Sequence, residues 1–96
     1  MKIAVKMDPK DNVAVVMQAV DQGDSVAVAQ GAAITALQPI GRGHKMAVTP
    51  IQAGDFIVKY GVPIGKASCD IPVGAHVHVH NVLDITREVN AVQLKG

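Results

Sequence analysis

The sequence has few aromatic residues and almost no cysteine. Among its 96 residues only Phe56 and Tyr60 are aromatic, and tryptophan is absent. The hydrophobic core must therefore consist of aliphatic side chains and methionine, and the aromatic platforms on which single-stranded nucleic acids stack are missing. The one cysteine, Cys69, has no second cysteine in the chain to pair with, which is typical of proteins in a reducing compartment.

The sequence also lacks long apolar runs and blocks of like charge. Nine basic and eight acidic residues give a formal net charge of +1, which argues against nucleic acid or an acidic membrane surface as the main partner. No apolar stretch approaches the roughly 20 residues that cross a bilayer, and residues 1–6 are too short and too alternating for a signal peptide. We therefore expect a soluble cytoplasmic protein that binds neither nucleic acid nor membrane.

What the sequence does contain is a series of short β-type segments. Runs rich in valine and isoleucine alternate with turns rich in Gly, Pro and Asp, including Asp11, and this pattern is typical of short strands. The expected strands lie at residues 2–7, 13–20, 25–29, 33–37, 45–48, 56–60 and 62–67. We expect one mostly β domain with little helix and no internal repeat, with a core over about residues 2–82 and a tail at 83–96 that docks on a partner.

The most distinctive stretch places three histidines, His76, His78 and His80, at alternate positions. Because successive side chains of a strand point to opposite faces, the three imidazoles are expected on one face, with Val77 and Val79 facing the core. Imidazole binds transition metals and exchanges protons near neutral pH. The alternative is an exposed strand face on which histidine is simply the polar residue. Same-face neighbours diverge on a flat strand, so a metal site would need ligands from elsewhere.

A second polar cluster contains Arg42, His44 and Lys45, with Gly41 and Gly43 on either side of the arginine. The planar guanidinium of arginine suits a carboxylate, and lysine adds a mobile positive charge. This cluster therefore suggests a site for a small acidic substrate. An exposed loop with ordinary surface cations is the alternative.

Four ordered motifs cover residues 11–81 of the chain: DNVA at 11–14, GHKMA at 43–47, KYGVPIG at 59–65 and GAHVHVHN at 74–81. Their order and spacing resemble the SAF domain at the N-terminus of altronate dehydratases. Related proteins include galactarate dehydratase and the small subunit of (2R)-sulfolactate sulfo-lyase. The resemblance implies a β-clip fold of short two-stranded sheets.

The resemblance also implies the chemistry of a lyase that depends on Fe²⁺ or Mn²⁺. In such an enzyme a sugar acid loses water, or sulfolactate loses sulfite, and a 2-keto acid forms. Because a much larger catalytic region usually follows this domain, the chain is expected to be a small subunit or N-terminal domain that works with a large catalytic subunit and is not active alone. The alternatives are a sulfo-lyase small subunit, a sugar-acid-binding module without catalysis, and a purely structural subunit.

At the matching positions, the resemblance implies roles for residues of both clusters. His44 and Lys45 are expected in catalysis. Arg42, Lys45 and Asn81 are expected to bind the substrate, with Arg42 and Lys45 attracting its carboxylate. These roles require the two clusters to converge in the fold.

The metal ligands implied by the resemblance are His76, His78 and His80. We also expect self-association, because a small β domain with weakly protected edge strands tends to pair with itself or with a partner.

Overall fold

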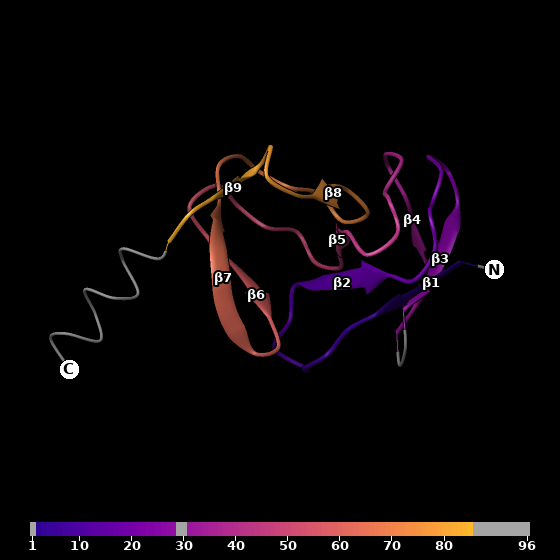
Figure 1. Ribbon diagram of the computed structural model, residues 1–96, viewed down its shortest axis with the longest axis horizontal. Coiled ribbons are helices and arrows are strands. Elements are labelled where there is room, and N and C mark those ends of the chain that lie inside the picture. Colours follow the sequence, from indigo (N-terminus) through magenta and orange to yellow (C-terminus); the bar gives the residue numbers. More distant parts are fainter. Residues whose placement is uncertain (1, 29–30, 86–96) are drawn as a thin grey trace, which may run out of the picture.

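The computed structural model describes residues 2–28 and 31–85, and these residues form short strands without any helix (Figure 1). The prediction of a mostly β fold is confirmed. Accordingly, no described segment is a helix long and apolar enough to cross a membrane. The strands are β1 (Lys2–Val5), β2 (Val13–Val16), β3 (Ser25–Val28), β4 (Ile34–Thr35), β5 (Lys45–Ala47), β6 (Phe56–Lys59), β7 (Val62–Ala67), β8 (His76–Val77) and β9 (Val82–Leu83).

The strands form two curled sheets. The larger sheet has the order β4-β3-β1-β2-β5-β8, and the smaller one has the order β6-β7-β9. β1 and β3 pair in parallel, whereas β5 and β8 pair antiparallel. In Figure 1, β6, β7 and β9 lie at one end, β1, β3 and β4 lie at the other, and β2, β5 and β8 lie between them.

Two aliphatic cores fill the interior, and strands β2 and β5 separate them. Ala14 and Met46 belong to the first core, while their neighbours Val13 and Ala47 belong to the second. Since neighbouring residues of a strand point to opposite faces, both strands are buried on both sides. This explains why β2 is a continuous apolar run, VAVV, and why Met46 and Ala47 of β5 are both apolar and buried. β8 adds to the second core through Val77, which is fully buried.

The backbone hydrogen bonds repeat along the chain with an offset of 31 residues, so the expectation of no internal repeat is wrong. Val20 and Ile40 exchange two backbone hydrogen bonds, and Ile51 and Ile71 do the same 31 positions later. The register of β2 against β5 recurs, with the same offset, as the register of β5 against β8. The repeat was missed because it lies in the spacing of glycines and apolar residues, with few identical residues.

Each repeated turn contains a glycine in the left-handed region of backbone conformation. These glycines, with φ angles from 82° to 91°, are Gly23, Gly43, Gly54 and Gly74. A Cβ atom at Gly23 would meet open space, whereas one at Gly74 would overlap the carbonyl oxygen of Thr35. At either position an alanine would have an unfavourable positive φ, but only at position 74 would its Cβ also clash with a neighbouring atom.

We expect Gly74→Ala to lower the free energy of unfolding by about 3 kcal/mol and Gly23→Ala to lower it by only about 1 kcal/mol. Urea unfolding followed by far-UV circular dichroism measures both losses. Equal losses would show that the packing of Gly74 against Thr35 has no effect on stability.

The expected tail at residues 83–96 is described only at its start. Leu83 belongs to β9, and Ile85 is buried. Residues 86–96, and with them the prediction that the tail docks on a partner, lie outside the described residues.

Candidate functional site

The histidine-rich stretch is a strand only in its first part. β8 contains His76 and Val77, and the chain then bends and turns through residues 78–81. Val77 is fully buried as predicted, but Val79 is 81% exposed. The expectation of a continuous strand with both valines in the core is therefore wrong beyond Val77.

Asn81 explains where the strand ends. Its side-chain Oδ1 accepts a hydrogen bond from the His78 N–H at 2.9 Å, and its Nδ2 donates to the His76 carbonyl at 2.8 Å. Its own N–H donates to the His78 carbonyl at 3.0 Å. These local hydrogen bonds compete with the pairing of a longer strand and close the chain into a turn. Asn81 is buried, and both polar groups of its side chain contact the backbone. Its role in substrate binding stays a prediction.

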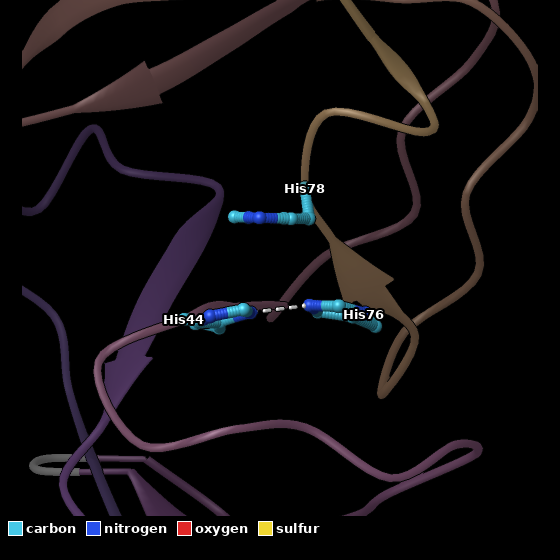
Figure 2. Close-up of side chains that lie close together, drawn as sticks. All are labelled: His44, His76 and His78. Atoms are coloured by element: carbon cyan, nitrogen blue, oxygen red, sulfur yellow. Dashed lines mark hydrogen bonds between the residues drawn. The ribbon is translucent and has the colours of Figure 1, made fainter.

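The two polar clusters converge, as the expected roles require. Met46 of β5 lies opposite His76 of β8, and this pairing brings His44, just before β5, next to the histidine stretch. The His44 Nδ1 and His76 Nε2 atoms are 2.9 Å apart. The His78 ring stacks on the His44 ring with 4.1 Å between centroids (Figure 2). One ring nitrogen of each of these three histidines lies within 4.8 Å of the other two.

Four of the expected site residues lie outside this group of three nitrogens: Arg42, Lys45, His80 and Asn81. His80 is exposed in the turn, with its ring centroid 5.1 Å from that of His76. Arg42 is exposed in the turn that precedes His44. A metal ligand at His80 and a substrate contact at Arg42 stay predictions. The third histidine of the group is His44, which was expected to be catalytic. The sequence had suggested His80 for this position beside His76 and His78.

A hollow of about 330 Å³ opens beside the histidines. Lys45, His78 and Asp84 supply its polar lining, and Ile64, Val79 and Leu83 are among its apolar walls. The burial of Lys45 lowers the pKa of its amino group, and the positive charge of Lys59 lowers it further. The hollow thus combines a partly buried cation, an imidazole and an exposed carboxylate with apolar walls, and such a combination suits a small polar organic molecule.

Comparison with known protein families identifies the domain. Residues 2–84 match the SAF domain of altronate/galactarate dehydratases. The chain belongs to this family. It is 44% identical over 81 residues to altronate dehydratase of Bacillus subtilis (strain 168), which covers 84% of the chain and 16% of the enzyme. It is also 44% identical over 77 residues to altronate dehydratase of Escherichia coli (strain K12), covering 80% of the chain and 15% of the enzyme.

A third relative is itself a subunit. The SAF domain is 48% identical over 48 residues to (2R)-sulfolactate sulfo-lyase subunit alpha of Paracoccus pantotrophus, which covers 50% of the chain and 72% of that subunit. The domain thus spans less than a fifth of the altronate dehydratases that it matches but most of the length of the alpha subunit.

The three convergent histidines of the SAF domain could hold one divalent transition-metal ion. The His44 and His76 nitrogens share a hydrogen bond of 2.9 Å, a separation close to that of neighbouring ligands of one octahedral ion with metal–nitrogen distances of about 2.1 Å. Imidazole nitrogens suit Fe²⁺ better than Mn²⁺, which prefers oxygen ligands. His44, His76 and His78 are therefore the residues of the described chain that would hold the metal.

The electrostatics of the site favour neutral imidazoles. Burial lowers the pKa of His76, and the neighbouring His80, His44, His78 and Lys45 lower it further. Partial burial likewise lowers the pKa of His78, with added contributions from His44, Lys45 and His80. Both rings thus stay neutral to a lower pH than an ordinary histidine. The neutral form is the one that binds a metal ion.

Proposed function

We propose that this SAF domain supplies the metal-binding histidines and a substrate-binding lysine of a sugar-acid dehydratase of the altronate type. The observation that carries the proposal is the convergence of His44, His76 and His78 beside Lys45. The identity to two altronate dehydratases over most of the chain supports the reaction class. The product would be a 2-keto-3-deoxy acid.

The residues of the site divide the work of dehydration. A bound Fe²⁺ or Mn²⁺ ion would act as a Lewis acid and stabilise the negative charge that develops as the proton next to the carboxylate is removed. His44, His76 and His78 would hold the ion. Lys45 would attract the substrate carboxylate into the hollow, and Arg42 would add positive charge at the exposed rim. Because its pKa is lowered by burial and by the charge of Lys59, the Lys45 amino group also gives up its proton more readily than an ordinary lysine, as proton transfer in catalysis requires.

The remainder of the active site would come from a larger catalytic part, either fused or separate. The matched altronate dehydratases extend far beyond the SAF domain, so a larger part exists in these relatives. The exposed apolar side chains Ile64, Val79 and Leu83 adjoin the hollow that contains Lys45 and His78. We place the larger part on this side, where it would cover the hollow and exclude water from it.

A second candidate function is that of the small subunit of a sulfolactate sulfo-lyase. The observation in its favour is the match to an alpha subunit that is mostly covered by this domain. The same site would serve both reactions, because each one removes a proton next to a carboxylate and expels a leaving group from the neighbouring carbon. The residues of the larger part would then distinguish a hydroxyl group from a sulfonate.

Exchange of domains in the two relatives tests the proposed function. In the first enzyme, residues 2–84 replace the matching segment of the Bacillus subtilis altronate dehydratase; in the second, the chain replaces the sulfo-lyase alpha subunit. We expect the exchanged dehydratase to form 2-keto acid from altronate, with His44→Ala lowering this activity about 100-fold. His80→Ala is the matched control and should change the activity less than about threefold.

Two results would contradict this proposal. Activity in the exchanged sulfo-lyase alone, with a folded but inactive dehydratase, would favour the second candidate function. An equal loss for His44→Ala and His80→Ala would show that the group of three histidines is not the functional unit.

A further inference from the structure

Two asparagines of the SAF domain make the same pair of hydrogen bonds. The Asn81 side chain bridges the His76 carbonyl and the N–H of the residue two positions later, at 2.8 and 2.9 Å. The Asn12 side chain bridges the Phe56 carbonyl and the Val58 N–H in the same way, at 2.9 and 2.8 Å. We call these two arrangements the Asn81 clamp and the Asn12 clamp. The Asn12 clamp holds strand β6, whose Ile57 belongs to the second core. The Asn81 clamp holds His76 and His78, two of the three residues whose imidazoles converge.

The Asn81 clamp compensates for the short pairing of β8. This strand has only two residues and lies at the edge of its sheet, where β5 is its single neighbour. Side-chain amides therefore bind the outer backbone groups of His76: its carbonyl accepts from Asn81, and its N–H donates to the Gln38 Oε1 at 2.9 Å. The position of His76 thus depends on two amide side chains as well as on the sheet.

We propose that Asn81 is a positioning residue of the histidine site. By fixing the His76 carbonyl and the His78 N–H in one turn, it sets how the two rings lie relative to each other and to His44. This inference rests on the proposed function for the metal, but the His44–His76 contact of 2.9 Å exists without a metal and tests the inference separately. Groups that orient metal ligands in this way typically change metal affinity by about 10- to 100-fold when they are removed.

The matched pair Asn81→Ala and Asn12→Ala tests this proposal on the full chain. Each variant removes two side-chain hydrogen bonds of the same kind, so we expect each to lower the urea midpoint of unfolding. Only Asn81→Ala should also weaken the binding of Mn²⁺, by about tenfold in calorimetric titration. In the metal-free protein, the nitrogen-15 NMR signals of His44 and His76 should show that their ring nitrogens are hydrogen bonded, and we call this the ring signature. Only Asn81→Ala should remove it.

The outcomes separate positioning from mere stability. If Asn81→Ala destabilises the fold as Asn12→Ala does but keeps the ring signature, Asn81 is only structural and the proposal fails. If the wild-type chain binds neither Mn²⁺ nor, under anaerobic conditions, Fe²⁺, the proposed metal function of this domain fails, while the ring signature still decides the role of Asn81.

Should Asn81→Ala fail to fold, Gln38→Ala tests the same positioning of His76 at an exposed residue. We expect it to weaken Mn²⁺ binding about threefold and to broaden the same ring signals. An unchanged affinity together with an unchanged ring signature would overturn the proposal that side-chain amides position His76.

Discussion

Replacement of Asp11 by alanine should lower the free energy of unfolding of the domain by about 4 kcal/mol. The Asp11 carboxylate is buried, with 2% of the residue exposed. It accepts hydrogen bonds from the backbone N–H groups of Gly61 at 2.8 Å, Asp8 at 3.0 Å, Tyr60 at 3.1 Å and Met7 at 3.2 Å. Alanine would leave these donors without their acceptor in a site that water reaches poorly, which is why we expect so large a loss.

The position of Asp11 in the fold explains why so many donors meet at one carboxylate. Two of them belong to its own turn before β2, and the other two belong to the turn between β6 and β7. Both residues of that second turn have positive φ, 58° for Tyr60 and 73° for Gly61, and the carboxylate stabilises this unfavourable conformation of Tyr60. Asp24→Ala is a suitable control, because Asp24 accepts one such bond in an exposed turn and should cost only about 1 kcal/mol.

The same contacts give stability a defined dependence on pH. Burial alone would raise the pKa of Asp11, but the hydrogen bonds from Gly61, Tyr60, Asp8 and Met7 outweigh burial and hold the pKa below its usual value. A lowered pKa in the folded state means that the stabilisation is complete above the unfolded-state pKa of about 3.9 and is lost as pH falls through the folded-state pKa. In urea unfolding between pH 5 and 2, wild type should lose stability more steeply than Asp11→Asn. If the free energy of unfolding fell equally with pH in wild type and in Asp11→Asn, the charge of Asp11 would not be the cause of the pH dependence.

The strands could be predicted from the sequence because their signals are local. The expected strands at residues 25–29 and 33–37 contain β3 and β4, which follow each other in the chain and pair antiparallel. Asp11 was likewise recognised as a turn residue. Its bonds to Tyr60 and Gly61 were not foreseen, because they join residues about 50 positions apart, and no local pattern reports such a pairing.

The three histidines that converge were all named as candidates from the sequence, but the geometry of their convergence was not foreseen. The periodicity of two pointed to His76, His78 and His80 as one row, yet Asn81 ends the strand after Val77. The antiparallel register of β5 against β8 then brings in His44. The sequence did contain one usable signal: asparagine at position 81 can hydrogen bond to the backbone a few residues before it and favours a turn over a longer strand.

The proposed binding of a metal ion by the SAF domain should weaken about 10³-fold between pH 7 and pH 4.5, because an imidazole must lose its proton to bind the ion. Burial and neighbouring positive charge lower the pKa of His76 and of His78. Protons therefore begin to compete with the metal at a lower pH than at ordinary histidines, whose pKa is about 6.5. We expect the affinity for Mn²⁺ to change less than about threefold from pH 7.5 to 6.5 and then to fall by more than one power of ten for each pH unit.

Calorimetric titration of wild type, His44→Ala and His80→Ala across this pH range measures the effect. His44→Ala should bind weakly throughout and show a shallower slope, since one competing proton is removed, while His80→Ala should follow wild type. The Asp11 carboxylate keeps stabilising the fold over this pH range, because a carboxylate with a lowered pKa stays ionised at pH 4.5. Weakening at low pH in a protein that circular dichroism shows to be folded can then be attributed to the histidines. An affinity independent of pH would point to carboxylate ligands instead and would refute the histidine site.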